Sequence, residues 1–522
     1  MIKQKIIRRI SMLLKELLRS SGIFYRATGD ENIEISTISS DSRSAVENSL
    51  FVCIRGRNHD GHSYAGVATA KGAVAILAEN ELSDLPSGVT VIYTHDTAAA
   101  LARLWDAWYR HPAKDMKLVA VTGTNGKTTV SFLLDAIFSA DFHKCGIIGT
   151  VYCRTPKRLL QTDSLTTPEP DTLYRVLSQM RDDGAEYVFI EASSQALALA
   201  RLAPLSFEAA VFTNLTPEHL DFHGSMENYF LAKASLLEKC KTAFINYDDS
   251  YAERYRSYAA AIGSNARIVY FSAQGRRGAD YKAEEIKLCG VGGIVYTLSA
   301  KNILREIRCP MVGRFNVDNT LAALAVSHNR GINVRIASEA LTGFGGAPGR
   351  LKRILTPSGY AASIYIDYAH TPDALERILE AVRGLTSEGG RIILVFGCGG
   401  DRDRLKRPHM GAIASRLADI CIVTSDNSRS ELPENIIGEI LCGLDHRSSH
   451  AVIPSRREAI RYAIEIARGG DVVLLCGKGH EKYEIGPQGR RNFDEAEIVE
   501  ESLKRLAQRV DLQMKEENEN EG

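Results

Sequence analysis

The chain has 522 residues, 44% of them apolar and 25% charged, which is the composition of an ordinary soluble globular protein. This length exceeds what one hydrophobic core usually holds, so we expect about three domains. Lysine plus arginine and aspartate plus glutamate both number 64, so no overall charge favours a nucleic acid or an anionic membrane, and an anionic substrate must be held by local clusters. The ten cysteines include no C-x-x-C pair, which indicates reduced thiols, a cytoplasmic protein and no zinc site.

The first twenty residues are basic and carry apolar residues at helical spacing, beginning at Ile6. Lys15, Glu16 and Arg19 interrupt this pattern, so it predicts an amphipathic packing helix rather than a signal peptide, with a membrane-surface helix as the alternative. No run of eighteen uncharged apolar residues occurs, so we expect no transmembrane span. Residues 511–522 are polar, and we expect a disordered tail there.

Residues 1–113 alternate strand-like runs with helical ones, which predicts a small N-terminal α/β domain. Ser42, Asn58 and His59 fall on predicted loops at strand ends, where such folds commonly place ligand-binding groups. Taken alone, these side chains would more commonly be ordinary turn residues. Pro112 and the polar residues after it indicate a linker to the next domain.

A glycine-bearing loop, Thr122-Gly-Thr-Asn-Gly-Lys-Thr-Thr129, follows a short apolar strand over 118–121 and precedes a helical pattern over 130–138. At such a junction the backbone N–H groups and the positive end of the helix dipole face one point, and Gly123 and Gly126 let an anion come close. The loop therefore predicts a phosphate-binding site.

Two side chains of this loop suit a nucleotide: Lys127 would reach the outer phosphates, and the Thr128 hydroxyl would bind magnesium. The usual G-x-x-x-x-G-K-[ST] motif has glycine where this chain has Val121, so only the second half of the motif fits. A strand-to-helix turn without a ligand is the alternative. The two glycines, the lysine and the two hydroxyls together favour phosphate binding.

The next predicted strands again end in polar residues. Glu191 stands at the carboxyl end of the strand 187–190, where ligands bind in parallel sheets, and is a candidate magnesium ligand or else a helix cap. His219 and His223 are four residues apart in a predicted loop, a pattern that is more often structural than metal-binding. The glycine-rich stretch 343–350 indicates a hinge near a domain boundary.

The last third repeats the strand-then-loop unit four times, with predicted strands over 363–366, 391–396, 420–423 and 471–475. Helical segments separate these strands, so we expect a parallel sheet with the four loops gathered at one edge. Two of the loops carry Arg402 and Arg429, which suit a carboxylate ligand because a guanidinium binds it in a two-pronged fork. Isolated arginines would more commonly form surface salt bridges.

In combination, these motifs resemble the Mur ligases, in unbroken order from about Ser40 to about Leu503. The resemblance rests on the phosphate loop, Glu191, His219, Lys233, Asn316, Arg350, Asp367-Tyr-Ala-His370, Gly397-Cys-Gly-Gly-Asp-Arg-Asp403 and Gly477-Lys-Gly-His-Glu481. It implies an α/β protein with a UDP-substrate domain (1–113), a central P-loop ATPase domain with a mostly parallel sheet (114–345) and a Rossmann-like amino-acid domain (346–510).

Within that family the chain is similar to the members that add the third residue of the peptidoglycan stem peptide. The implied reaction is ATP-dependent amide formation through an acyl phosphate, with UDP-N-acetylmuramoyl-L-alanyl-D-glutamate, ATP, Mg²⁺ and meso-diaminopimelate as reactants and cofactor. A monomer is implied, and no nucleic acid.

The resemblance assigns residues to four groups. Those around ATP are Gly123, Thr124, Asn125, Gly126, Lys127, Thr128, Thr129, Asn316, Arg350, Asp367 and His370. Those for the UDP substrate are Ser40, Ser42, Asn58, His59, Thr166, Thr167, Ser193 and Arg201. Those for the incoming amino acid are Arg402, Asp426, Asn427, Ser428, Arg429, Gly477 and Glu481. Thr128 and Glu191 would serve one magnesium, and His219 with a carbamylated Lys233 a second; Lys127, Glu191, His219 and Lys233 form the implied catalytic set.

Two positions depart from the family pattern. Leu199 stands where a substrate-binding glutamine is expected, which removes one polar contact. The loop Asp426-Asn-Ser-Arg429 has Ser428 in place of a common proline but keeps Arg429, which would pair the distal carboxylate that diaminopimelate has and lysine lacks. This favours meso-diaminopimelate, since an unpaired charge partner costs about 2–5 kcal/mol. L-lysine or another diamino acid is the alternative, and other amide ligases or a non-catalytic nucleotide-binding protein are the competing classes.

Overall fold

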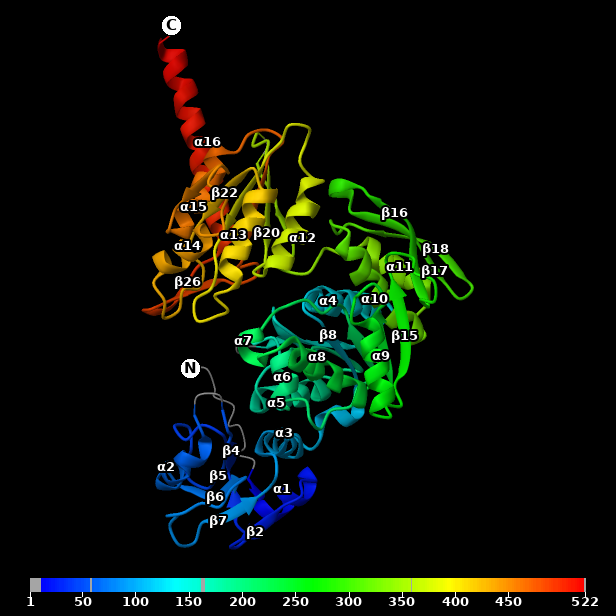
Figure 1. The fold of residues 1–522 in the computed structure, drawn as a ribbon, viewed down its shortest axis with the longest axis vertical. Helices are drawn as coiled ribbons and strands as arrows, with labels where there is room; N and C mark the ends of the chain where they lie inside the picture. The colour runs from blue at the N-terminus through cyan, green and yellow to red at the C-terminus, as the bar shows by residue number, and fades with distance from the viewer. Residues whose placement is uncertain (1–10, 57–58, 161–164, 358, 521–522) are drawn as a thin grey trace. The chain divides into compact units, whose positions relative to one another are not determined.

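The computed structural model describes residues 11–56, 59–160, 165–357 and 359–520, without the side chains of residues 510–520 (Figure 1). The chain packs into two compact units, one of residues 1–120, 143–210 and 232–241, the other of residues 121–142, 211–231 and 242–522. The chain passes between the units at five points, two of which lie in strands β8 (Lys117–Thr122) and β13 (Ala209–Phe212). The three-domain division therefore stays a prediction.

The first unit begins with a five-stranded sheet in the order β2-β7-β6-β5-β4. Its strands are β2 (Arg26–Thr28), β4 (Thr37–Ser39), β5 (Ser49–Val52), β6 (Ala73–Ala78) and β7 (Thr90–Tyr93), with β2 antiparallel to β7 and the others parallel. Around it lie β1 (Met12–Leu13) paired with β3 (Glu34–Ile35), and the helices α1 (Leu14–Ser21), η1 (Gly61–Tyr64), α2 (Ala65–Ala70), α3 (Thr97–Trp108) and η2 (Pro112–Asp115). Helix α1 buries Leu14, Leu17 and Leu18, so the predicted amphipathic packing helix is confirmed over these residues.

The rest of the first unit contains the strands that lead to Glu191. Parallel strands β9 (Cys145–Ile148) and β12 (Tyr187–Glu191) pair directly, and β10 (Cys153–Arg154) and β11 (Leu159–Leu160) extend them antiparallel. The helices here are α5 (Pro170–Asp182), α6 (Ser194–Ala198) and η3 (Ser235–Glu238). Every residue of β12 is buried, as expected for a strand inside a parallel sheet.

The second unit contains the helix after the phosphate loop, α4 (Lys127–Ala140). Strands β14 (Thr242–Asn246), β15 (Arg267–Ser272) and β16 (Tyr281–Leu288) are parallel, and β17 (Ile294–Ala300) and β18 (Ile303–Cys309) continue antiparallel. Its other helices in this region are α7 (Leu220–His223), α8 (Met226–Ala234), which ends in the first unit, α9 (Ala252–Ala261), η4 (Gly290–Gly292), α10 (Phe315–Asn329) and α11 (Val334–Thr342). Helices α10 and α11 both pack against α4 and so fix its direction.

The second unit also contains a six-stranded sheet in the order β19-β20-β24-β21-β22-β23. Its strands are β19 (Lys352–Ile354), β20 (Ser363–Asp367), β21 (Ile392–Phe396), β22 (Ile420–Val423), β23 (His450–Val452) and β24 (Val472–Cys476); β19 is antiparallel and the others are parallel. Helices α12 (Pro372–Arg383), α13 (Lys406–Leu417) and α14 (Pro433–Leu441) cover one face, and α15 (Arg456–Ile466) and α16 (Glu495–Asn520) the other. The four predicted strands and the parallel sheet are confirmed.

A hairpin, β25 (Tyr483–Gly486) and β26 (Gly489–Asn492), follows the last parallel strand. Helix α16 is described as far as Asn520, and the disordered tail expected over residues 511–522 stays a prediction. Across the described parts of the chain, no helix is both long and apolar enough to cross a membrane.

Candidate active site

The phosphate loop has the predicted strand–loop–helix form, between β8 and α4. Gly123 has φ +147°, and a Cβ there would lie 1.9 Å from Thr213 Oγ1. A side chain is therefore excluded at this position, because the loop backbone lies directly on Thr213. Thr213 in turn donates its hydroxyl hydrogen to the Asn125 carbonyl at 2.6 Å, which fixes the middle of the loop.

Lys127 and Thr128 stand at the first turn of α4. The Lys127 ammonium donates to the carbonyls of Gly123 at 2.9 Å and Thr124 at 2.8 Å, so it lies over the loop at the positive end of the helix. The Thr128 hydroxyl accepts a hydrogen bond from Arg350 Nη2 at 3.0 Å. Arg350 also stacks on Tyr368, 4.8 Å from the ring centroid, so its guanidinium is held beside the loop.

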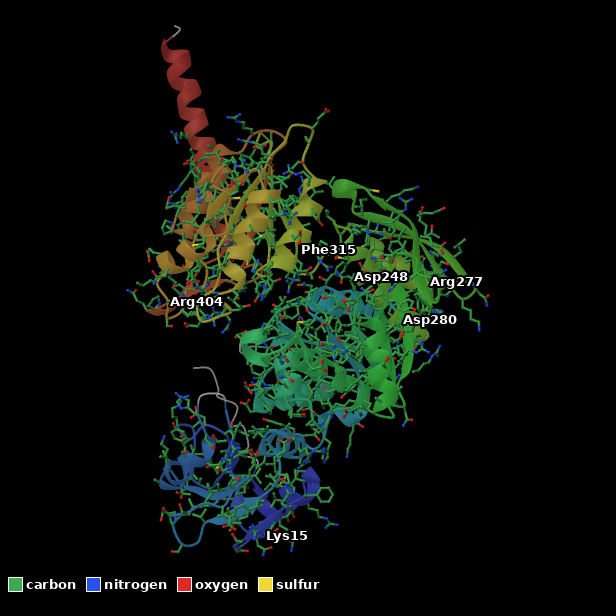
Figure 2. All side chains as sticks on the ribbon, viewed as in Figure 1. Lys15, Asp248, Arg277, Asp280, Phe315 and Arg404 are labelled. Carbon is green, nitrogen blue, oxygen red and sulfur yellow. The ribbon has the colours of Figure 1, made fainter. Side chains whose placement is uncertain are left out.

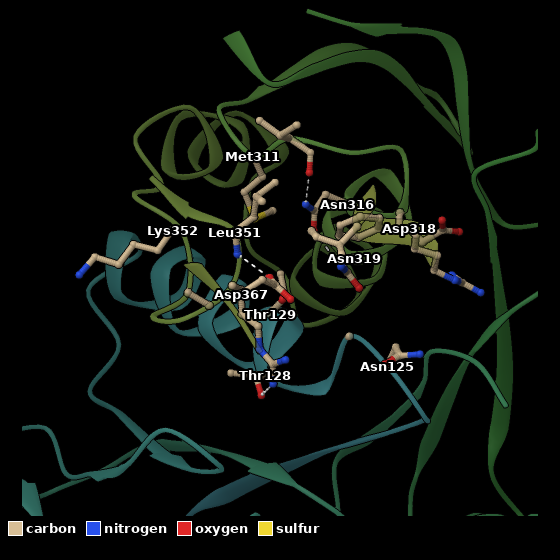
Figure 3. Close-up of a pocket in the computed structure, with 18 of the residues that line it drawn as sticks. Asn125, Thr128, Thr129, Met311, Asn316, Asp318, Asn319, Leu351, Lys352 and Asp367 are labelled. Carbon is tan, nitrogen blue, oxygen red and sulfur yellow. Dashed lines mark hydrogen bonds between the residues drawn. The ribbon is translucent and has the colours of Figure 1, made fainter. Parts of the chain in front are cut away.

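A cavity of about 600 Å³ opens next to this loop (Figure 3). Seven residues expected around ATP line it: Asn125, Gly126, Thr128, Thr129, Asn316, Arg350 and Asp367. Gly123, Thr124, Lys127 and His370 were expected there too, but they do not line the cavity. Burial raises the pKa of Asp367, which accepts hydrogen bonds from the backbone N–H groups of Leu351 at 2.6 Å and Ala369 at 2.7 Å.

The sequence analysis missed Asn319 and Asp318, which also line the cavity and are labelled in Figure 3. Asn319 donates to Asn316 Oδ1 at 2.9 Å, so the two amides act as one polar pair on α10. Their spacing of three residues in a predicted helix was the available signal, because residues i and i+3 share a helix face.

Asp318 gives a test of the cavity's electrostatics. Burial, and then the neighbouring Asp248 (Figure 2), raise its pKa to about 7. This folded pKa exceeds the unfolded one, so the ionised carboxylate destabilises the fold increasingly as pH rises from about 4 to about 7. We expect Asp318→Asn to raise the free energy of unfolding by about 2 kcal/mol at pH 8 and to leave it unchanged near pH 4.

Thermal unfolding of the full chain at both pH values measures this effect. Asp115→Asn, which changes an exposed aspartate, is the matched control and should shift neither midpoint. An equal gain for Asp318→Asn at both pH values would show that charge is not the cause.

Glu218 is a third residue that the sequence analysis missed. Its carboxylate lies 3.6 Å from His219 Nε2 and 3.7 Å from His370 Nε2. Burial acts to raise the pKa of Glu218, but the nearby histidines, Lys127 and Lys406 outweigh it and lower the pKa. Burial lowers the pKa of His370 to about 4, so this imidazole is neutral at pH 7. The structure thus places His219 and His370 around one carboxylate.

In the first unit, Glu191 is fully buried and accepts hydrogen bonds from the Thr150 hydroxyl at 2.8 Å and the Thr150 N–H at 3.1 Å. Thr166 lies 3.0 Å from that same hydroxyl. Thr167 donates to the Glu191 carbonyl at 2.7 Å and lies 3.0 Å from the Ser193 hydroxyl. The predicted substrate-binding residues 166, 167 and 193 are therefore brought together at the end of β12.

Arg201 completes this group. Its Nη1 donates to the Thr167 carbonyl at 2.8 Å, and its Nη2 forms an ion pair with Glu169. The remaining candidates of the substrate set are less constrained: Ser40 and His59 are exposed, and the His59 ring faces Tyr64 at 6.4 Å. Ser42 is partly exposed, and Asn58 lies outside the described residues.

The metal candidates offer hard donor atoms. Glu191 supplies carboxylate oxygens and Thr128 a hydroxyl, which suit Mg²⁺. Lys233, 1% exposed, would suit Mg²⁺ only as a carbamate, because an ammonium has no lone pair to give. In the described ranges, no group of three or more histidine, cysteine, aspartate or glutamate side chains could hold a metal by itself.

The predicted amino-acid loops follow β21, β22 and β24, which are neighbours in the sheet. Burial, and then the charge of Arg429, lower the pKa of Arg402, because the two guanidinium groups lie close enough to repel. Arg429 has a left-handed backbone (φ +52°), and its Nη1 donates to the Gly400 carbonyl at 2.8 Å. Two arginines held together in this way form a local positive site for an anionic group.

Comparison with known proteins gives the family. Residues 34–109 match the description "Mur ligase family, catalytic domain", residues 121–327 "Mur ligase middle domain" and residues 349–479 "Mur ligase, glutamate ligase domain". The chain is 42% identical, over 94% of its length and 99% of the relative's, to UDP-N-acetylmuramoyl-L-alanyl-D-glutamate--2,6-diaminopimelate ligase of Syntrophomonas wolfei. The chain belongs to the Mur ligase family.

Other relatives agree. The Clostridioides difficile protein of the same name is 38% identical over 95% of this chain and its whole length. A solved structure with that name is 32% identical, covers 91% of this chain and 95% of its own, and superposes with a TM-score of 0.63. The MurF ligase of Thermotoga maritima in complex with ADP is 18% identical with a TM-score of 0.58, and shares the fold.

Two departures from the Mur ligase pattern have structural counterparts. Leu199 stands at the end of α6 and is 38% exposed, an apolar side chain at a position where the family pattern has an amide. Ser428 is 4% exposed, and the carbonyl of this residue lies 2.0 Å from where a Cβ on Gly400 would be. The loop at Ser428 is thus packed tightly although it lacks the proline.

Proposed function

We propose that this member of the Mur ligase family is an ATP-dependent amide ligase that joins meso-diaminopimelate to UDP-N-acetylmuramoyl-L-alanyl-D-glutamate. The observation that carries the proposal is that one unit contains both a phosphate loop beside a cavity and paired Arg402 and Arg429 at neighbouring strand ends. The names of the similar ligases support the choice of substrates. We also propose that the enzyme acts in the cytoplasm as a monomer.

The reaction needs two steps because a carboxylate is a poor electrophile. In the first, a carboxylate oxygen of the D-glutamate attacks the γ-phosphorus of ATP, the bond to the β-phosphate oxygen breaks, and an acyl phosphate and ADP form. In the second, the amine of the amino acid attacks the acyl carbon, phosphate leaves, and the nitrogen loses a proton. Lys127 and the N–H groups of the phosphate loop reduce the repulsion between the carboxylate and the triphosphate.

Magnesium suits this chemistry, and Thr128, Glu191, His219 and carbamylated Lys233 are the residues that would hold it. When bound, Mg²⁺ neutralises phosphate charge and polarises the phosphoryl group. Carbamylation converts the buried Lys233 from a cation into an oxygen ligand, the type that a hard cation prefers. A carbamate signal from ¹³C-labelled bicarbonate, absent in Lys233→Ala, would test this assignment.

The other predicted groups divide between the substrates. Thr166, Thr167, Ser193 and Arg201 are proposed to hold the muramoyl dipeptide, with Ser40, Ser42, Asn58 and His59 toward the uridine. Asn316, Arg350, Asp367 and His370 surround the nucleotide. Asp426, Asn427, Gly477 and Glu481 bind the amino-acid head group, and Arg402 and Arg429 the distal carboxylate.

Phosphate release tests the proposal directly. The purified protein is mixed with ATP, Mg²⁺ and the UDP-muramoyl dipeptide, and meso-diaminopimelate is compared with L-lysine. We expect phosphate release with diaminopimelate only. For Arg429→Ala we expect kcat/KM to fall by the equivalent of about 2–5 kcal/mol of transition-state stabilisation, because the distal carboxylate loses its charge partner.

Arg447→Ala, which removes an exposed arginine paired with Asp445, is the control and should behave like the unaltered protein. Release with lysine would keep the ligase and overturn the assignment of Arg429. Release with neither amino acid would overturn the proposed function.

A further inference from the structure

Lys478 is a completely buried lysine between the second and third amino-acid loops. Its ammonium donates to Asn427 Oδ1 at 3.0 Å and to the Tyr483 carbonyl at 2.9 Å. It also lies 3.9 Å from carboxylate oxygens of both Asp426 and Glu481. An ammonium has three hydrogens, and two of them are used by these neutral oxygens, while the two carboxylates lie within ion-pair distance of the charge.

Asn427 is fixed in one orientation by this contact. Its Oδ1 accepts from Lys478 and from the Ile485 N–H at 2.9 Å, which uses both lone pairs. Its Nδ2 donates to Glu481 Oε2 at 2.7 Å. Only one amide hydrogen of Asn427 is left for a ligand, so the residue's main task is to hold Glu481 and the loop.

Strand β25 of the hairpin forms hydrogen bonds to the same loop on both sides of Ser428. The Ile485 N–H donates to Asn427, and the Arg429 N–H donates to the Ile485 carbonyl at 3.0 Å. Lys478 ties the start of this strand to the loop through the Tyr483 carbonyl. These bonds supply the rigidity that a proline at position 428 would otherwise give.

Lys478 also brings a positive charge close to two carboxylates. Asp426 and Glu481 are both anionic when ionised, and Lys478 is the cation that lies between them. Gly477 lets the chain approach this closely: it has φ +117°, and a Cβ there would lie 2.3 Å from Asp426 Oδ2. Arg456 also acts on Asp426 and Arg429 on Glu481, so Lys478 is one of the cations that hold these two carboxylates in place.

We propose that Lys478 is a positioning residue for the amino-acid substrate: it aligns Asn427, Glu481 and the backbone of Arg429 without contacting the substrate itself. This inference rests on the proposed ligase function. It concerns the amino-acid site alone, so the sites for ATP and the UDP substrate should not depend on Lys478.

The test is Lys478→Met, which removes the charge and the donors but keeps most of the apolar stem. We expect KM for meso-diaminopimelate to rise about 10-fold to 100-fold, because misaligned binding groups lose much of their effect. KM for ATP and KM for the UDP-muramoyl dipeptide should stay within twofold. Lys482→Met is the matched control: this lysine lies on the same loop, is 78% exposed and pairs with Asp494, and its variant should keep all three KM values.

A purely structural role would instead change all three KM values together. Stabilisation of Lys478→Met by ADP, measured by thermal shift, checks folding independently of ligase activity. If that variant does not fold, Ile485→Pro, which removes the N–H donated to Asn427, should raise the same single KM. An unchanged KM for diaminopimelate in a Lys478→Met variant that folds and binds ADP would overturn the inference. Absence of ligase activity in the unaltered protein would overturn the proposed function instead.

Discussion

Lys127→Ala is expected to lower kcat about 10³-fold, the largest catalytic effect of any single change in the phosphate loop. The ammonium lies at the N-terminus of α4, held by the Gly123 and Thr124 carbonyls, within the group of N–H donors that faces a bound phosphate. Negative charge develops on the leaving oxygen of ADP in the transition state, and this cation is the loop's means of stabilising it. Single-turnover ADP formation with the UDP-muramoyl dipeptide measures the step.

The control for this prediction is Lys117→Ala, at the start of the strand that precedes the loop. Lys117 is exposed and donates to the Tyr187 hydroxyl at 3.3 Å, so its loss should leave kcat unchanged. Lys127→Arg should not restore the rate, because the larger guanidinium does not fit between the two loop carbonyls. A Lys127→Ala protein that keeps more than a tenth of the rate would show that the backbone donors suffice.

Arg456→Met is expected to cost about 3–5 kcal/mol of stability in the C-terminal sheet. Arg456 is fully buried and pairs with Glu495, 2% exposed, at 2.8 Å. It also donates to the carbonyls of Ser425 at 3.2 Å and Cys476 at 2.6 Å, so it joins the ends of β22 and β24. Removing the guanidinium leaves a buried carboxylate and two carbonyls without their donor.

Hydrogen exchange of the β22 and β24 amides measures this loss of stability at the place where it occurs. Tryptophan fluorescence would not report it, because both tryptophans lie in α3. Arg457→Met is the neighbouring control: its pair with Glu501 is about half exposed, and such pairs contribute about 1 kcal/mol or less. The double change Arg456→Met with Glu495→Met should cost less than the sum of the single changes. Additive costs would mean that the two side chains do not stabilise each other.

Much of the fold follows from the order of residues along the chain. The buried strands β21, β22 and β24 of the C-terminal sheet are runs of apolar residues, and the loops after 396, 423 and 476 are polar. Parallel strands joined by helices must bring their carboxyl ends to one edge, so the gathering of Arg402, Asp426 and Gly477 could be predicted without coordinates. The phosphate loop could be predicted equally well, because glycine, lysine and threonine at that spacing serve one kind of ligand.

Other site residues could not be found in this way. Glu218 precedes a histidine in an ordinary loop, and only the fold brings it within 3.7 Å of His370, about 150 residues later in the chain.

The sequence by itself determined the order of strands, loops and helices, and from it we predict which residues carry the chemistry: the anion loop, the carboxylate at the end of β12 and the arginines of the amino-acid loops. The tertiary structure alone decided how they are held, through the burial of Lys478 and Arg456 and through the bonds from Ile485 to Asn427 and Arg429. The physical reason is the separation along the chain of the residues that interact. Strand, loop and helix patterns depend on neighbours in the chain, whereas a buried charge is stable only beside partners that the folded chain supplies from distant segments.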